Sequence, residues 1–243
     1  MSTWYREELS CSICEHRFPG KLLYGMHVSN LPEARAQILD GSFQLFTCPE
    51  CGHVFRIERR AVYTDFDRGH YLAIEPGNRE ATAKAVAEQE AVFSEAFTYG
   101  PEVAAKLGDA LIRRVVFGFD AAREKLLLWD AGIDDRAFEA AKLDAMKAAG
   151  LTSARNTRSP CVLRLEKLMD RGHILCRRVE ATWRVLSRRG THTAVVAMPR
   201  TLGFNTIPAA MLAARVDAPD SIVRDYPWLG HGWLVDGVLG ARA

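Results

Sequence analysis

Two cysteine pairs decide how the first part of this chain folds: Cys11-Ser12-Ile13-Cys14 and Cys48-Pro49-Glu50-Cys51-Gly52. Zinc prefers four tetrahedral ligands, and thiolates bind it well. Two residues between ligands let one tight turn, here called a knuckle, aim both sulfur atoms at a single ion. Gly52 lets the second knuckle reverse without a Cβ clash. The spacing predicts one Zn²⁺ bound by Cys11, Cys14, Cys48 and Cys51, with two redox-active pairs or cysteines that bind no metal as the alternatives.

The role expected for this zinc is structural. Four thiolates complete the tetrahedron and leave no open position for a substrate or a water molecule. Phe18 and Phe55 each lie four residues after the last cysteine of their knuckle, where an aromatic ring can cover the apolar back of a zinc ribbon. His16 and His53 lie two residues after the knuckles, and we expect them to be solvated or hydrogen-bonded rather than to hold a second ion.

Short strands and one helix are expected around and between the knuckles. The helix is predicted to begin near Asn30, a good N-cap, with Pro32 in its first turn, and to run to Leu39. Its predicted end is Asp40-Gly41. A hairpin is predicted next, with strands over 61–65 and 70–74 and with Gly69 in a turn that favours positive φ.

Helices dominate the middle of the chain and strands its last third. Predicted helices cover 80–97, 120–129 (capped by Asp120) and 134–149 (capped by Asp134), with a strand over 111–117. The predicted later elements are strands over 162–169, 174–179, 182–187 and 194–198 and a short helix over 208–215. The expected fold class is therefore α+β: an N-terminal zinc-ribbon-like module with an inserted helix, then helices, then a C-terminal antiparallel β-rich region.

Composition and charge limit the class of protein that this chain can be. The chain has 243 residues, of which 48% are hydrophobic and 26% charged, the ordinary balance of a soluble globular protein. The net charge of +2 divides unevenly: residues 61–150 carry −5 and residues 151–243 carry +7. This shift predicts two domains, 1–150 and 151–243. The first ten residues lack an apolar signal segment, and the longest uncharged run, about fourteen residues, is too short for a membrane span. We therefore expect a cytoplasmic protein with no membrane partner.

Residues 8–75 resemble the CpXC domain, a bacterial and archaeal module named for its paired Cys-Pro-x-Cys motifs. The similarity rests on the cysteine pairs together with Leu31-Pro32-Glu33, Ile38-Leu39-Asp40-Gly41 and Tyr63-Thr64-Asp65, and it extends to about residue 145. The first knuckle departs from the family pattern. Ser12-Ile13 stands where the family usually has a proline, and Glu15 stands where a glycine is common. The thiolates are retained, so the resemblance implies a zinc-ribbon-like fold with four ligands. It implies no activity, because the family has no characterised function.

Three functions fit these patterns. A closed metal site and the lack of common catalytic motifs favour a zinc-stabilised interaction or regulatory module that binds a protein partner or a second copy of itself. The basic C-terminal region supports nucleic-acid binding as an alternative. Its candidate residues are Arg177, Arg178, Arg188 and Arg189.

An enzyme of unrecognised class is the third possibility, and no catalytic residue is assigned. Its best support is Asp65, Asp67 and His70 around the hairpin turn. Turns are also where aspartates naturally occur, so a purely structural role is favoured. Cys161 and Cys176 are expected to be buried, inert thiols.

Overall fold

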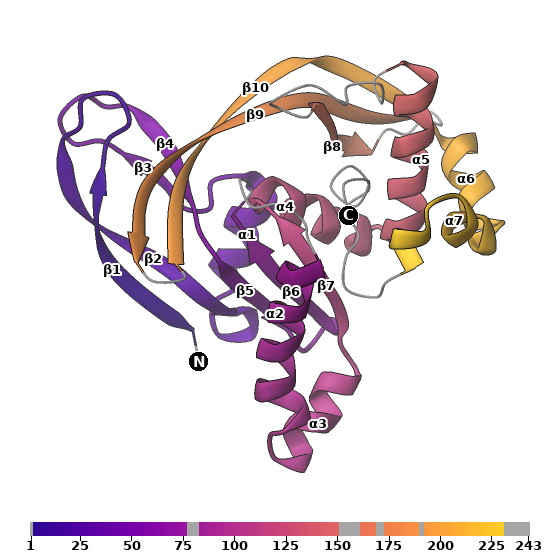
Figure 1. The fold of residues 1–243 in the computed structure, drawn as a ribbon, viewed down its shortest axis with the longest axis horizontal. Coiled ribbons are helices and arrows are strands. Elements are labelled where there is room, and N and C mark those ends of the chain that lie inside the picture. Colours follow the sequence, from indigo (N-terminus) through magenta and orange to yellow (C-terminus); the bar gives the residue numbers. More distant parts are fainter. Residues whose placement is uncertain (1, 77–82, 151–160, 169–172, 190–191, 231–243) are drawn as a thin grey trace. The chain divides into compact units, whose positions relative to one another are not determined.

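The computed structural model describes residues 2–76, 83–150, 161–168, 173–189 and 192–230. It contains two compact units (Figure 1). Unit 1 comprises Met1–Ala122 and Trp183–Ala197, and unit 2 comprises Arg123–Thr182 and Met198–Ala243. The boundaries of these units differ from the charge shift near Gly150. A domain boundary at that residue stays a prediction.

A mixed five-stranded sheet forms the centre of unit 1, in the order β1-β2-β5-β6-β7. The β5–β6 pair is the predicted hairpin, and Gly69 in its turn has a φ of 68°. All six residues of β6 are buried, as expected of a central strand covered on both faces. Sequence analysis did not predict the parallel pairings of β2 with β5 and of β6 with β7. The strands are β1 (Thr3–Ser10), β2 (Arg17–His27), β5 (Ala61–Asp65), β6 (His70–Glu75) and β7 (Ile112–Phe117).

The predicted helix between the knuckles is α1, Pro32–Asp40, which ends at Gly41 in the left-handed conformation with a φ of 81°. Its N-cap is Leu31, so the prediction that Asn30 caps this helix is wrong. Asn30 instead belongs to a short 3₁₀ turn, η1 (Val28–Asn30), which precedes the helix. After α1 come β3 (Leu45–Thr47) and β4 (Val54–Glu58), which pair antiparallel across the second knuckle.

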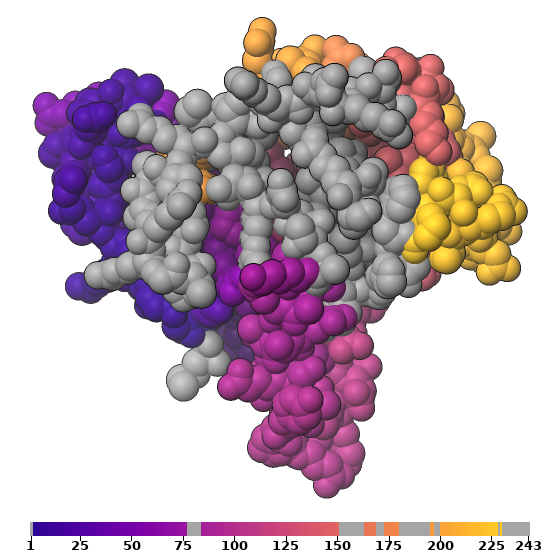
Figure 2. All heavy atoms as spheres, in the orientation of Figure 1, coloured from indigo at the N-terminus to yellow at the C-terminus, as the bar shows by residue number. Residues whose placement is uncertain are grey.

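A helical hairpin follows the central sheet strands. It consists of α2 (Ala83–Phe93), a π-helical turn η2 (Ser94–Thr98) and α3 (Glu102–Asp109). The part of the predicted 80–97 helix before Ala83 lies outside the described residues. Figure 2 shows the atoms of this hairpin in magenta at the molecular surface, and Tyr99 at its tip is 81% exposed.

Two helices pack on strands in unit 2. α5 (Asp135–Ala148) begins at the predicted N-cap, Asp134, whose side chain accepts a hydrogen bond from the backbone N–H of Arg136. Asp120 does not cap the preceding helix: α4 spans Phe119–Asp130, and Asp120 lies inside it and pairs with Arg56 at 2.8 Å. An apolar core joins α4, α5, β8 and β9, and its buried members include Leu128, Phe138, Leu163 and Cys176.

The C-terminal region is antiparallel and strand-rich, as predicted, but with fewer and longer strands. The predicted strands over 174–179 and 182–187 form one continuous strand, because Glu180-Ala181 between them contains no glycine or proline to end it. The elements here are β8 (Cys161–Leu168), β9 (His173–Arg189), β10 (His192–Pro208), α6 (Ala209–Val216), α7 (Pro219–Asp225) and η4 (Pro227–Gly230). The α+β fold class, with a four-cysteine module at the N-terminal side, is thus confirmed.

Candidate metal centre

The two knuckles have the same backbone construction. In the first, the N–H of Cys11 donates to the carbonyl of His16 at 2.9 Å, and the N–H of Glu15 donates to the carbonyl of Cys11 at 3.1 Å. In the second, Cys48 donates to His53 and Gly52 donates to Cys48, both at 2.9 Å. Each knuckle is therefore a closed turn that turns its two thiols to the same side.

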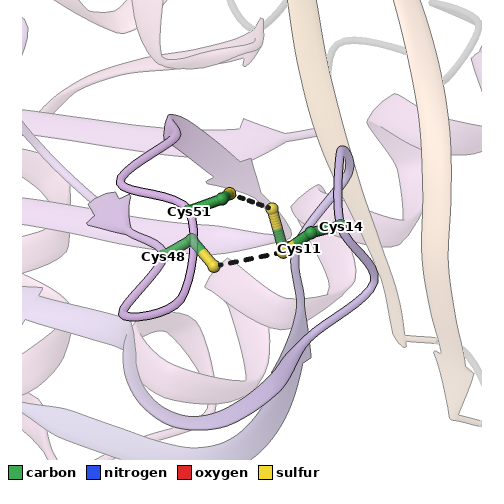
Figure 3. Close-up of side chains that lie close together, drawn as sticks. All are labelled: Cys11, Cys14, Cys48 and Cys51. Carbon is green, nitrogen blue, oxygen red and sulfur yellow. Dashed lines mark hydrogen bonds between the residues drawn. The ribbon is translucent and has the colours of Figure 1, made fainter.

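The four sulfur atoms converge (Figure 3). All lie within 4.8 Å of one another, and the Sγ atoms of Cys11 and Cys51, like those of Cys14 and Cys48, are 3.6 Å apart. A tetrahedral zinc site with Zn–S bonds of about 2.3 Å places its sulfurs about 3.8 Å apart. The spacing also exceeds the S–S bond of about 2.05 Å, and all four cysteines are free thiols. The donor set and its geometry thus fit one thiophilic metal ion.

Burial divides the four cysteines into an inner and an outer pair. Cys11 and Cys48 are each 1% exposed, whereas Cys14 and Cys51 are exposed to solvent. The inner pair belongs to an apolar cluster whose other members are Leu9, Leu22, Phe55, Ile57 and Val196. The four-cysteine cluster is therefore continuous with the core of unit 1.

Aromatic rings cover the base of the knuckles, as the sequence predicts. Phe18 and Phe55 contact each other edge to face, with ring centroids 6.2 Å apart. The imidazoles of His16 and His53 stack on these rings at 6.4 and 5.8 Å. Within the described residues, the four cysteines are the group that gathers three or more metal-ligating atoms, so neither histidine belongs to a second cluster.

Cys11 and Cys14, the two thiols of the first knuckle, have strongly perturbed pKa values. Burial raises the pKa of Cys11, but hydrogen bonds from the backbone of Cys14 and Ile13 and from neighbouring thiols outweigh it and lower the pKa to about 6. A backbone hydrogen bond from the His16 N–H lowers the pKa of Cys14, yet burial and the adjacent thiols raise it to about 12. One thiol therefore ionises first, and its charge opposes ionisation of its neighbour. A cation placed between them would remove that conflict.

The first knuckle contains a strained residue. Glu15 has a φ of 61°, close to the 70° of Gly52 at the equivalent position of the second knuckle. Only glycine adopts this region without steric cost, and Asn or Asp tolerate it better than Glu. The two knuckles therefore share one turn geometry, although only the second has a glycine at this position.

A family model described as CpXC protein matches residues 9–142. The chain belongs to the CpXC family. The match includes both knuckles and ends within α5, so it confirms the resemblance drawn from the cysteine pairs and the segments between them. Neither the curated proteins nor the solved structures contain a match to the chain.

The aspartates weighed in this CpXC protein as support for an enzyme, Asp65 and Asp67, have structural contacts. Asp65 is fully buried, accepts hydrogen bonds from Tyr63 and Arg68, and lies 3.9 Å from the guanidinium of Arg35. Asp67 is exposed and accepts a hydrogen bond from Ser29 at 3.0 Å. Asp65 therefore anchors the hairpin, while Asp67 faces solvent.

The arginines proposed for nucleic-acid binding are only partly described. Arg177 pairs with Glu166 at 3.3 Å, and Arg178 donates to the carbonyl of Leu202 at 3.0 Å. The side chains of Arg188 and Arg189 lie outside the described residues, as does that of Cys161.

Cys176 is fully buried, and burial together with Glu124 raises its pKa to about 12, which fits an inert thiol. No helix in the described part of the chain is both long enough and apolar enough to cross a membrane.

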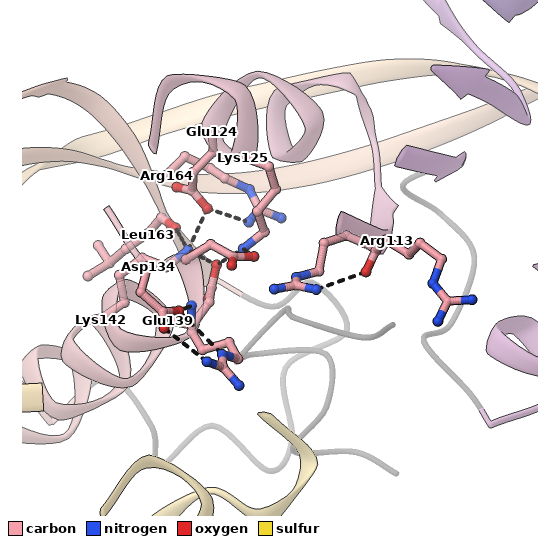
Figure 4. A network of polar contacts seen from close by, with 11 residues as sticks. Arg113, Glu124, Lys125, Asp134, Glu139, Lys142, Leu163 and Arg164 are labelled. Carbon is pink, nitrogen blue, oxygen red and sulfur yellow. Dashed lines mark hydrogen bonds and ion pairs between the residues drawn. The ribbon is translucent and has the colours of Figure 1, made fainter. Parts of the chain in front are cut away.

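Sequence reasoning missed a buried charged network in unit 2 (Figure 4). The ammonium group of Lys142 lies 2.7 Å from Glu124 and 2.9 Å from Glu139, while that of Lys125 lies 2.8 Å from Glu139. All four side chains are at most 2% exposed. Burial raises the pKa of Glu139, but the two lysines outweigh it and hold the pKa far below the usual range.

The sequence carried a signal for this network. Glu139 and Lys142 follow Asp135 by four and seven residues, so the three side chains share one face of α5. A charged helical face ordinarily points to solvent. Here it points into the protein, because α4 supplies complementary charges and Glu124 also accepts from the backbone N–H of Leu165 in β8 at 2.6 Å.

Proposed function

We propose that this CpXC protein binds one structural Zn²⁺ through Cys11, Cys14, Cys48 and Cys51. The observation that carries the proposal is the near-tetrahedral spacing of four thiols held by two closed turns. Zinc matches this all-sulfur, four-coordinate donor set, and a completed tetrahedron has no position for a reacting group. Because the thiols must stay reduced to bind metal, a reducing compartment such as the cytoplasm fits this role.

The biochemical role we propose for the metal-braced module is an interaction platform for a protein partner or a second copy of the chain. Zinc would couple folding of the knuckles to the core that contains Cys11 and Cys48. Exposed apolar side chains surround this module in unit 1, among them Ile13 at 68% and Val54 at 53% exposure. Such side chains are the usual material of a binding surface.

Elemental mass spectrometry on the untagged full chain, purified without added zinc, tests the metal assignment. We expect one zinc per chain, and less than a tenth of that for Cys48→Ser. Cys176→Ala is the matched control: it removes a buried thiol outside the cluster and should keep full metal content. Full zinc in Cys48→Ser, or thiols that cycle between reduced and disulfide forms without metal, would contradict the proposal.

The interaction role is tested by purification of the zinc-loaded chain from its native cell, followed by measurement of its mass in solution. A stoichiometric protein partner or a stable dimer is expected. A clean monomer without a partner counts against it. Salt-sensitive binding to DNA or RNA by the same zinc-loaded chain would favour the basic C-terminal region as the functional surface instead.

A further inference from the structure

A cavity of about 280 Å³ lies beside β3 in unit 1, away from the metal ligands. Its walls come from β1 and β2, from α1, and from the segment 42–46 that leads into and forms β3. We call it the β3 cavity and define it by Trp4, Lys21, Ala34, Gln44, Leu45 and Phe46.

The cavity lies against the turn at 42–44 and the first two residues of β3. The N–H of Leu45 closes that turn by donating to the carbonyl of Ser42 at 3.1 Å, and Leu45 and Phe46 of β3 continue the lining. Leu45 and Phe46 are successive residues of a strand, so their side chains point to opposite faces and the cavity reaches the edge of β3. Among the described strands β3 pairs with β4 on one side and is the outermost strand in its order. Its other edge therefore presents backbone N–H and C=O groups that can pair with an added strand.

Gln44 is the unusual residue of this cavity. Its φ is 52°, in the left-handed region that a glutamine rarely adopts. Both its Nε2 and its Oε1 atoms are buried without a hydrogen-bond partner. A buried polar group without a partner destabilises the fold, and such residues concentrate at binding sites. Gln44 is one of the lining residues, so a ligand that supplied both an acceptor and a donor there would satisfy its amide.

The rim combines apolar surface with opposite charges. Trp4 and Leu45 are each 42% exposed, and the ammonium of Lys21 lies 4.0 Å from the centroid of the Trp4 ring. Glu33 of α1 lines the cavity and is exposed. A mixed, partly apolar rim of this kind suits a neutral, amphipathic ligand better than a polyanion.

We propose that the β3 cavity binds an extended peptide that adds a strand to the free edge of β3 and places a carboxamide side chain, asparagine or glutamine, against Gln44. A primary amide supplies one donor and one acceptor and so pairs with Gln44 in both directions. Backbone pairing provides affinity in this mode and the side-chain pocket provides specificity. The inference deepens the proposed interaction role and rests on it, because it names the partner as a protein segment in extended conformation.

The test begins with a phage-displayed library of random 12-residue peptides, selected on the zinc-loaded full chain. The most enriched peptide is then synthesised with a fluorophore, and its Kd is measured by fluorescence polarisation. Enrichment of peptides with an asparagine or glutamine between apolar residues is expected. N-methylation of alternate peptide amides should weaken binding at least tenfold, because it blocks strand pairing and keeps the side chains.

Gln44→Met separates recognition from stability. Methionine matches the length of glutamine and carries the same backbone strain but has no amide, so binding should fall at least tenfold while the midpoint of thermal unfolding stays equal or rises. Val103→Ala, an exposed apolar residue of α3 outside the cavity, is the control and should leave the Kd unchanged. If Gln44 had a purely structural role, Gln44→Met would instead lower the midpoint of thermal unfolding and leave peptide binding unchanged.

Three results would overturn the inference: no enriched peptide, unchanged binding by Gln44→Met, or equal binding of the N-methylated peptide. Measuring the zinc content of each sample distinguishes failure of the peptide site from failure of the proposed metal binding. A zinc-loaded chain that retains a stoichiometric partner, cross-linked outside the β3 cavity, would uphold the interaction role and reject this site.

Discussion

The residue that stands out in the first knuckle is Glu15, because it occupies a backbone conformation that its counterpart Gly52 adopts without a Cβ. The two knuckles close with the same pair of backbone hydrogen bonds, so the turn forms with or without a Cβ at this position. Closure of the turn thus carries a local conformational cost.

Glu15→Gly should therefore stabilise unit 1. We expect the free energy of unfolding to rise by about 0.5–1 kcal/mol, since the steric cost of positive φ disappears. Glu15→Ala separates this effect from loss of the carboxylate, because alanine keeps the Cβ. Urea denaturation of the zinc-loaded chain measures both, and a glycine variant no more stable than the alanine variant would refute the argument.

At the scale of elements, the first residue of α5 can be predicted from the sequence, but its buried charged face cannot. Asp134 caps it by accepting a hydrogen bond from the N–H of Arg136 at 2.8 Å. Burial raises the pKa of Asp134, but hydrogen bonds from Arg136 outweigh it and hold the pKa below its usual value. A lowered pKa means that the cap stabilises the fold above about pH 4 and that this stability is lost as the pH falls.

Asp134→Ala should cost about 1 kcal/mol of stability at pH 7. Asp134→Asn is the matched control, because asparagine retains the cap and loses only the charge. The difference between aspartate and asparagine should shrink below pH 4, where the aspartate becomes protonated. Urea denaturation at pH 7 and pH 3 tests this, and a difference that grows in acid would contradict the sign.

The inward face of α5 makes a stronger prediction. Lys142→Met leaves Glu124 and Glu139 buried without one of their cations, so the stability of unit 2 should fall by about 3–5 kcal/mol. Lys106→Met removes an exposed pair with Glu102 and should cost less than 1 kcal/mol. Chemical denaturation followed by circular dichroism compares the two. Equal losses would mean that the network contributes no more than a surface ion pair.

At the scale of the whole molecule, the four-cysteine cluster and the charged network belong to different compact units. Metal removal should therefore act unevenly along the chain. Cys11 and Cys48 lie in the core cluster with Leu9, Phe55 and Val196, so loss of the ion should loosen that cluster first.

Chelation should raise hydrogen–deuterium exchange over residues 9–22 and 45–57 while α5 keeps its protection. Mass spectrometry of peptic fragments, before and after metal removal, measures this, and restored zinc should restore protection. Uniform loss of protection through α5 would show that the two units unfold together. No change at the knuckles would show that the metal contributes nothing to the fold.

Sequence alone predicted the features that depend on neighbours in the chain. The convergence of the four thiols follows from cysteine spacing, because each knuckle is one tight turn. The cap of α5 and the β5–β6 hairpin follow from residues a few positions apart. The cap of α1 was placed one residue early, because the 3₁₀ turn ending at Asn30 competes for the same residues.

Only the tertiary structure decided which faces meet. The parallel pairing of β6 with β7 joins strands that the α2–α3 hairpin separates, and no local pattern specifies it. From the sequence alone, the charged face of α5 is expected to be exposed to solvent; in the structure α4 covers it with opposite charges. Gln44 would be taken for an ordinary loop residue, but strands and a helix together with it line one cavity. Burial is the physical reason: it sets the cost of a charge or an amide, and it is determined by residues distant in the chain.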